Sequence, residues 1–306
     1  IRSLISKAMS PRMINNLKPH IEEIAYELLE DIKGKTEIEL IKEFAYPLPV
    51  LVIAELLGVP DEDRDKLKVW AKYLVKSVDA LPMSSEEHKM LNKAGAEVAA
   101  YFGSLIAERR GSEGEDLITQ LTKANDGGIS LTSGELISNC AFLLIAGHET
   151  TMNLITNGTL ALLTNPEQLE ILRSDPKIAE NATEELLRYD SPVQLIGRVA
   201  YAPFVFGDVT VAEGEQLGLF LGAANRDPEV FTNPDQLDIT RKELAHLAFG
   251  QGIHYCLGAP LGRLEGEIAF KAIFETFPNL KVKDVRHEYR PSFSMRELLS
   301  LRLLTQ

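Results

Sequence analysis

The sequence predicts a mainly α-helical protein with a minor antiparallel β region. Apolar residues recur at helical spacing through the first two thirds of the chain. One apolar segment, residues 132–165, contains no proline and is long enough to form a central helix. From about residue 193 onward, apolar and polar residues alternate between glycine turns, as in short strands. We expect a single domain over residues 1–306, with its elements intertwined around the long helix.

Turn and capping signals bound the helices expected before residue 132. Gly34 and Gly58 end the first two, and a Ser-Ser-Glu-Glu sequence opens the fourth. The opening stretch IRSLISKAMSPR has the character of the interior of an amphipathic helix. The expected segments are residues 11–33, 48–57, 61–78, 84–110 and 112–124.

The segment 132–165 is expected to be a buried central helix. It starts at a Thr-Ser cap and ends before an Asn-Pro pair. At about 1.5 Å per residue such a helix crosses an entire domain, and its apolar character nearly all round indicates burial. Two shorter helices, over residues 166–175 and 178–191, are expected to follow it.

The last third of the chain is expected to supply the strands. Residues 193–200, 204–224 and 298–305 alternate in polarity and are rich in β-forming residues, with glycine turns between them. A helix over residues 259–277 is expected to interrupt this strand-rich part.

Composition excludes several classes of protein. The net charge of −13 argues against nucleic-acid binding, because there is no basic excess to offset phosphate repulsion. No apolar run approaches the roughly 20 residues that a membrane span needs, so no span is expected in these residues. Cys140 lies in an apolar run and Cys256 in a polar turn, which does not suggest a disulfide framework. A reducing, cytoplasmic location is therefore expected.

The stretch Phe249–Gly258 (FGQGIHYCLG) is the first candidate site. Cys256 lies directly before an expected helix, whose free N–H groups and dipole favour a thiolate. The stretch has three glycines that permit tight turns and close approach of a large flat partner. These glycines are Gly250, Gly252 and Gly258.

The residues alone leave the role of Cys256 open. A thiolate held in this way serves as an axial metal ligand or as a nucleophile, and a lone cysteine is also often an inert buried thiol. A zinc site is disfavoured, because His254 and Cys256 supply two ligands at most.

AGHETT (Ala146–Thr151), inside the long segment, is the second candidate site. Gly147 costs helix stability, and Glu149 and Thr150 are expensive in an apolar setting unless they bond to something. One interpretation is a local opening of the helix where a small ligand and water sit. The other is a kink with satisfied polar groups.

Two further charged positions stand out. Glu185 and Arg188, in EELLR, lie one helical turn apart and in isolation are typical of a solvated surface salt bridge. Arg198 sits in an expected strand amid apolar residues, where a cation needs an anion.

Together these segments resemble the cytochrome P450 family, of the soluble bacterial type. FGQGIHYCLG is similar to the family's haem-binding signature, and AGHETT to its oxygen-activation segment. Glu185-x-x-Arg188 resembles its invariant charged pair, and ANRDP (224–228) is a common phrase ahead of the cysteine. The order and separations also fit, and the resemblance covers the chain from Arg2 to the final strands. Family members extend further at the N-terminus, so we expect this chain to be N-terminally incomplete.

The resemblance implies a cytochrome P450-like fold and a haem-thiolate monooxygenase that carries heme b (iron protoporphyrin IX). Such an enzyme activates dioxygen and inserts one oxygen atom into an apolar, lipophilic small molecule. It implies a ferredoxin or flavodoxin, with its reductase, as electron donor. Cationic charge for docking this donor is expected from Lys7, Arg12 and Arg263, although solvated surface charges have the same appearance.

The resemblance also implies roles for individual residues. Cys256 is expected to be the proximal ligand of the haem iron, and Thr150 and Glu149 to deliver protons during dioxygen activation. Glu185 and Arg188 are expected to be structural. The expected cofactor-binding positions are Arg2, Ala146, Gly147, Arg198, Phe249, Gly250, His254, Cys256 and Gly258. The expected substrate-pocket positions are Phe142, Ile145, Val193, Leu195, Ile196 and Met295.

Two other functions fit a haem-thiolate site. One is a peroxygenase driven by peroxide, although the acid and alcohol at Glu149 and Thr150 favour dioxygen. The other is a haem-thiolate binding or sensing protein without catalytic activity.

Overall fold

The computed structural model describes residues 1–77, 82–124, 128 and 130–306, and its backbone is mainly helical. Helical segments alternate with loops up to Tyr189, and most of the strands follow, as the sequence predicts. The α-helices are α1 (Arg2–Ala8), α2 (Pro11–Glu30), α3 (Pro47–Leu57), α4 (Arg64–Leu74), α5 (Ser85–Arg109), α6 (Leu117–Lys123), α7 (Ser133–Thr164), α8 (Pro166–Ser174), α9 (Ala179–Tyr189), α10 (Leu221–Ala224) and α11 (Ala259–Thr276).

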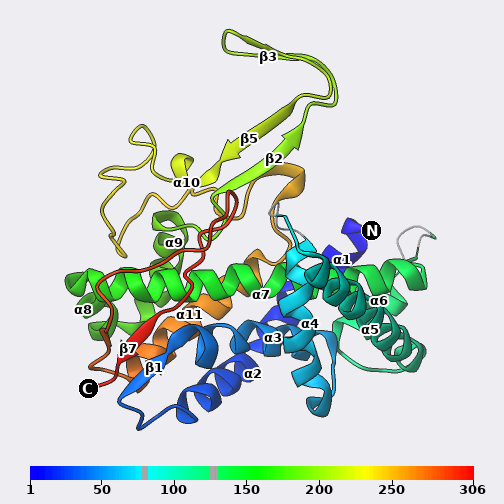
Figure 1. The fold of residues 1–306 in the computed structure, drawn as a ribbon, viewed down its shortest axis with the longest axis horizontal. Helices are drawn as coiled ribbons and strands as arrows, with labels where there is room; N and C mark the ends of the chain where they lie inside the picture. Colours follow the sequence, from blue (N-terminus) through cyan, green and yellow to red (C-terminus); the bar gives the residue numbers. More distant parts are fainter. Residues whose placement is uncertain (78–81, 125–127, 129) are drawn as a thin grey trace.

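Helix α7 crosses the centre of the molecule, and the other helices pack around it (Figure 1). Thr132 and Glu135 form a capping box at its start, which satisfies backbone N–H groups that would otherwise lack partners. Residues 151–162 are buried without interruption, whereas the first half of the helix keeps an exposed face that includes Phe142 and Ala146. The predicted central buried helix is thus confirmed for its second half. Within the described part of the chain, no helix is both long and apolar enough to cross a membrane.

Small residues bring α7, α9 and α11 close together. A Cβ on Gly158 of α7 would lie 2.4 Å from the ring of Phe270 on α11. A Cβ on Gly266 of α11 would lie 2.7 Å from Thr183 on α9. Because both distances are shorter than real Cβ contacts, any larger residue at either position would force its neighbour to shift. This packing fixes the start of α11, and with it Cys256, relative to α7.

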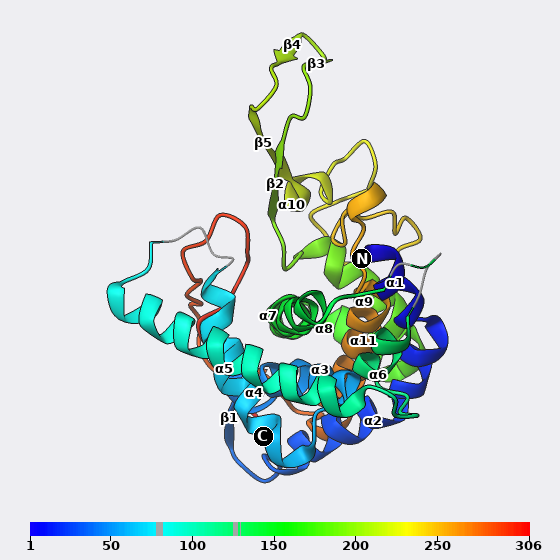
Figure 2. The same cartoon turned by 90° about the vertical axis from the view of Figure 1, so that its right-hand side faces the viewer.

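The strands form small antiparallel sheets. One sheet has the order β1–β7–β6, in which Ile38 of β1 pairs with Leu303 of β7. The strand pair β2–β5 carries the β3–β4 hairpin outward from the helical body (Figures 1 and 2). The strands are β1 (Glu37–Glu39), β2 (Leu195–Val199), β3 (Phe204–Phe206), β4 (Val209–Val211), β5 (Gln216–Phe220), β6 (Lys281–Val282) and β7 (Arg302–Leu304).

Several predicted boundaries differ from the structure. Helix α6 starts at Leu117 and not at residue 112, because the side chain of Asp116 accepts a hydrogen bond from Thr119 N and caps it there. The opening helix breaks after Ala8, and the Ser10 side chain caps α2. The segment predicted over 61–78 contains α4 between two 3₁₀ turns, and its last residue lies outside the described residues.

Candidate haem-binding and active site

A cavity of about 310 Å³ lies between α7, strand β2 and the stretch Phe249–Gly258, which we call the cysteine loop. Its volume falls within the range of about 300–1,000 Å³ found for small-molecule sites. The cavity brings together residues that the sequence predicted separately as cofactor-binding or catalytic. Those that line it are Ala146, Thr150, Arg198, Phe249, Gly250, His254 and Cys256.

Cys256 lies at the end of the cysteine loop, with its backbone N–H donating to the carbonyl of Phe249 at 2.9 Å. Cys256 is exposed at its surface, but desolvation by the surrounding protein atoms still raises the pKa of its thiol. The N–H groups of Gly258 and Ala259 and the charges of Arg2 and Arg263 act in the opposite direction, without outweighing it. The predicted influence of the helix start on the thiol is present, but it does not lower the pKa of the free thiol overall. Cys140 is the other free cysteine and is fully buried, in keeping with the apolar run around it.

The glycines of the cysteine loop do not all serve one purpose. Gly250 and Gly252 have φ of 68° and 69°, in the left-handed region that side chains with a Cβ rarely adopt. Gly258 has an ordinary φ of −81° and precedes α11. It does not line the cavity, so the predicted cofactor contact of Gly258 is not seen.

Two cationic or potentially cationic side chains face the cavity. Arg198 and His254 both line it, from β2 and from a 3₁₀ turn of the cysteine loop. Within the described residues, Arg198 forms no ion pair, and its Nη1 donates to the carbonyl of Gly197 at 2.8 Å. Arg2 does not line the cavity, because its guanidinium donates to the backbone carbonyl of Tyr255. Arg2 therefore holds the cysteine loop from α1.

The AGHETT segment forms the opposite wall without any opening of the helix. Helix α7 continues regularly through it, and Thr150 Oγ1 donates to the carbonyl of Ala146 at 3.1 Å. The local opening, one of the two interpretations of this segment, is not present in the structure, and such an i−4 hydrogen bond satisfies the threonine hydroxyl within a regular helix. Gly147 does not line the cavity. A Cβ there would lie 2.6 Å from Ile53 of α3, so the glycine serves helix packing.

Glu149 points away from the cavity and toward the loop between β6 and β7. Its Oε1 lies 3.2 Å from Arg290 Nη1, and the same nitrogen donates to Glu297 Oε2 at 2.8 Å. Glu149 is not among the residues that line the cavity, whereas its neighbour Thr150 is. The predicted acid and alcohol therefore lie in different places: Glu149 forms an ion pair with Arg290, and Thr150 lines the cavity.

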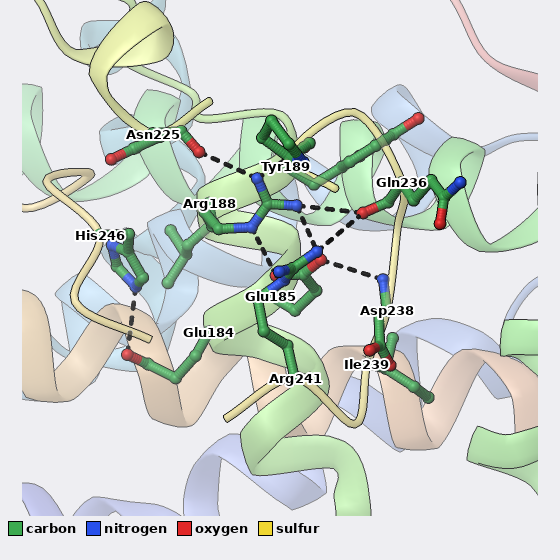
Figure 3. A network of polar contacts seen from close by, with 12 residues as sticks. Glu184, Glu185, Arg188, Tyr189, Asn225, Gln236, Asp238, Ile239, Arg241 and His246 are labelled. Atoms are coloured by element: carbon green, nitrogen blue, oxygen red, sulfur yellow. Dashed lines mark hydrogen bonds and ion pairs between the residues drawn. The ribbon is translucent and has the colours of Figure 1, made fainter. Parts of the chain in front are cut away.

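Glu185 and Arg188 form a bidentate ion pair whose side chains are both 0% exposed (Figure 3). The Nε–Oε2 and Nη2–Oε1 distances are 2.7 and 2.8 Å. Arg241 donates to the same carboxylate at 3.1 Å. The guanidinium of Arg188 also donates to backbone carbonyls of the loop that follows α10, at Asn225, Pro234 and Gln236. The pair is thus a buried structural network that ties α9 to this loop, and the surface salt bridge is excluded.

The predicted substrate-pocket residues divide into groups. Val193 and Ile196 line the cavity. Phe142 does not line it; this residue is 58% exposed and lies four residues before Ala146, on the same face of α7. The remaining three do not line the cavity, and one of them, Met295, forms an isolated β-bridge with Val193. The other two are Ile145 and Leu195.

Some residues of the site were missed by sequence reasoning. Arg290 and Arg241 bind site carboxylates from distant segments, and no local pattern marks them. Glu184 stands beside Glu185 in EELLR and binds Arg263 and His246 near the cysteine loop. The double glutamate was a usable signal, because adjacent residues on a helix point in different directions and so have different partners.

The cavity suits a haem group by its own chemistry. It offers a soft sulfur donor at Cys256, apolar walls from α7 and β2, and Arg198, which has no acidic partner among the residues that the structure describes. A cysteine thiolate can ligate the haem iron, and an arginine can bind the carboxylates of the haem.

Comparisons with known proteins agree with this assignment. A family model described as cytochrome P450 matches residues 64–301. The chain is 44% identical over 301 residues to the biotin biosynthesis cytochrome P450 of Bacillus subtilis, over 98% of this chain and 76% of that protein. It is 44% identical over 296 residues to cytochrome P450 107B1 of Saccharopolyspora erythraea, over 96% of this chain and 71% of that protein.

Solved structures show the same fold. P450BioI, in complex with an acyl carrier protein ligated to hexadec-9Z-enoic acid, superposes with a TM-score of 0.92 at 44% identity, over 100% of this chain and 78% of that one. CYP109E1 from Bacillus megaterium, in complex with testosterone, gives a TM-score of 0.94 at 34% identity, over 100% and 83% of the chains. The chain therefore belongs to the cytochrome P450 family and is a monooxygenase that binds haem b.

Proposed function

We propose that this monooxygenase activates dioxygen and inserts one oxygen atom into an apolar small molecule, with electrons from a separate ferredoxin or flavodoxin. The observation that supports this most is the meeting of Cys256, Arg198 and Thr150 around one cavity. These residues come from three distant segments and supply a sulfur ligand, a cation and a hydroxyl.

In this proposal, Cys256 ligates the haem iron, and Arg198 and His254 bind the carboxylates of the haem. When bound, the haem supplies a thiolate-ligated iron whose electron density favours cleavage of the O–O bond. Arg2 acts indirectly, because it holds the carbonyl of Tyr255 in the cysteine loop. The network of Glu185 and Arg188 supports the site by fixing the loop that leads to the cysteine loop.

Thr150 is proposed to hold a proton at its hydroxyl oxygen in the cavity wall. Its hydrogen is donated to Ala146 O, so the oxygen lone pairs are available to accept from a water or a ligand. Glu149 is the proposed source of protons. Because Arg290 binds its carboxylate outside the cavity lining, proton delivery by Glu149 requires this ion pair to open.

The substrate is proposed to be lipophilic, with a long apolar chain or a polycyclic skeleton. The apolar lining residues Val193 and Ile196 and the exposed ring of Phe142 support this class. Similar proteins were solved with a fatty acid on its carrier protein and with testosterone. Difference spectra of the haem-bound protein with free fatty acids, carrier-linked fatty acids and steroids test the class. No spectral shift with any of them would count against it.

The electron donor is proposed to dock beside α1 and the start of α2, where Lys7 and Arg12 are exposed. The contribution predicted for Arg263 is reduced, since Glu184 neutralises its charge. Charge reversal at Arg12 should slow the reduction of the haem by the donor. The rate of this reduction should also depend less on salt concentration. A cytoplasmic location stays a prediction from the two unpaired cysteines.

Replacement of Cys256 by alanine tests the function at its centre. Loss of the sulfur ligand should abolish the thiolate-type Soret band of the reduced CO complex, while Cys140→Ala should keep it. An unchanged band in Cys256→Ala would refute the ligand assignment. Turnover with dioxygen and a ferredoxin system, compared with turnover by peroxide alone, separates the proposed monooxygenase from a peroxygenase.

A further inference from the structure

One carboxylate of α9, Glu184, binds two side chains near the cysteine loop. Arg263 of α11 donates to it from Nε and Nη2, at 2.5 and 3.0 Å. His246 lies with Nε2 3.1 Å from the same carboxylate (Figure 3). Nδ1 of His246 accepts a hydrogen bond from the backbone N–H of Ala248. Its Nε2 therefore carries a hydrogen and donates a hydrogen bond to the Glu184 carboxylate. Glu184 thus orients both an arginine and a histidine.

These two side chains both contact Phe249, the first residue of the cysteine loop. The guanidinium carbon of Arg263 lies 4.5 Å from the centre of the Phe249 ring, within cation–π distance. The ring of His246 lies 6.2 Å from it, centre to centre. The aromatic ring that lines the cavity is therefore held by two groups whose positions depend on one carboxylate.

The same arginine reaches the other end of the loop. Arg263 Nη1 donates to the hydroxyl of Tyr255 at 2.9 Å, next to the cysteine in the sequence. The N–H of Cys256 in turn donates to the carbonyl of Phe249 at 2.9 Å. Arg263 thus contacts the side chains of Phe249 and Tyr255, which flank the backbone hydrogen bond of Cys256.

The ion pair is partly shielded from solvent. The side chain of Glu184 is 16% exposed, that of Arg263 33% and that of His246 1%. Burial alone would raise the pKa of Glu184, but the hydrogen bonds from His246 and Arg263 lower it to about 2. The carboxylate therefore stays charged and balances Arg263, whose charge also reaches the Cys256 thiol.

We propose that Glu184 is a positioning residue for the cysteine loop, acting through Arg263 and His246 to hold Phe249 and Tyr255 around Cys256 and to balance the cationic charge beside the thiolate. The inference rests on the proposed ligand role of Cys256.

The charge balance is tested by the reduction potential of the haem-bound protein. Glu184→Gln leaves Arg263 uncompensated, which stabilises the more negative reduced site, so the potential should rise. Arg263→Gln should lower it, and the double variant should return toward the wild-type value. A change of about tenfold in the one-electron equilibrium constant corresponds to about 59 mV. Glu180→Gln, an exposed carboxylate one turn earlier on α9, is the matched control and should leave the potential unchanged.

The positioning of the cysteine loop is tested by urea titration. The thiolate-type Soret band of the reduced CO complex and the circular dichroism are followed together. In Glu184→Gln, the Soret band should disappear at a lower urea concentration than the helical circular dichroism signal. The double variant should not restore the band to the wild-type urea concentration. Arg263→Lys, which keeps the charge but not the bidentate geometry, should show the same loss with little change in potential. The proposal is overturned if Glu184→Gln keeps the wild-type potential and loses band and helix together. If Cys256→Ala keeps the thiolate-type band, the ligand assignment fails instead, so the two failures are distinguishable.

Discussion

Glu149 and Arg290 form an ion pair of 3.2 Å between Oε1 and Nη1, although 141 residues separate them in the sequence. Arg290 Nη1 also donates a hydrogen bond to Glu297 Oε2 at 2.8 Å, so two carboxylates share one guanidinium nitrogen. The side chains of Glu149 and Glu297 are 13% and 14% exposed, which limits screening by solvent. This triad anchors the centre of α7 to the loop between β6 and β7.

Arg290→Gln should destabilise the protein, because it leaves two largely buried carboxylates without their shared cation. In a double-mutant cycle, Glu149→Gln and Arg290→Gln should show a coupling energy of about 1 kcal/mol. Urea unfolding of the haem-bound protein measures it. The pair Asp284 and Arg302, bidentate and more exposed, is the control cycle and should couple more weakly. Additive effects at residues 149 and 290 would show that the ion pair does not form in solution.

Thr150→Ala should leave the haem bound but reduce the yield of product per electron severalfold, with peroxide released in its place. The hydroxyl belongs to one of two threonines, Thr150 and Thr151, by which α7 lines the cavity, and alanine removes its proton-holding oxygen. Product and peroxide are measured together under a fixed supply of electrons.

Thr159→Val is the matched control for Thr150→Ala, on the same helix. The Thr159 hydroxyl is buried and lacks a hydrogen-bond partner among the described residues, so an isosteric methyl group should cost no stability. Equal product yields in wild type and Thr150→Ala would remove Thr150 from proton delivery.

The parts of the site that could be predicted from the sequence are those in which a short stretch carries the signal. FGQGIHYCLG contains its turn glycines and its cysteine and precedes a helix start, and the structure places Phe249, Gly250 and Cys256 of this stretch on the cavity wall. Glu185 and Arg188 lie one turn apart on α9, and the geometry of a helix brings them together.

The parts that could not be predicted depend on long-range packing. Glu149 and Thr150 are neighbours in the sequence, but consecutive helical residues point about 100° apart, so one lines the cavity and the other meets Arg290. The pairing of β1 with β7 joins opposite ends of the chain, and no local pattern marks β1. Arg241 reaches Glu185 from a loop without regular structure.

Glu185→Gln should destabilise the protein by about 3–5 kcal/mol, the usual result of removing one partner of a buried ion pair. The carboxylate accepts from Arg188 and Arg241 and from the backbone N–H of Asp238, so its loss leaves two buried cations uncompensated. Arg241→Gln should cost less, because the bidentate pair with Arg188 survives. The free energy of unfolding in urea measures both, and equal costs would contradict the central position of Glu185.

Glu184 should make the stability of the protein depend on pH in the acid range. Its pKa falls from an ordinary 4.5 to about 2, because hydrogen bonds from His246 and Arg263 outweigh the effect of burial. Charged groups of both signs line the surface pocket beside it, namely Lys177, Lys242, Asp175 and Glu180. A carboxyl with a lower pKa in the folded state binds fewer protons there than in the unfolded state. Its stabilisation, about 3 kcal/mol, is therefore complete above about pH 4.5 and is lost as the pH falls toward 2.

Glu184→Gln removes this titration, so the difference in free energy of unfolding between wild type and variant should shrink as the pH falls from about 5.5 to 3. Glu180→Gln, on the same helix but exposed, should show a small difference that stays constant. Urea titrations at several pH values provide the measurement. If the difference in free energy of unfolding between wild type and Glu184→Gln does not change with pH, then Arg263 and His246 do not stabilise the charged form of the Glu184 carboxylate.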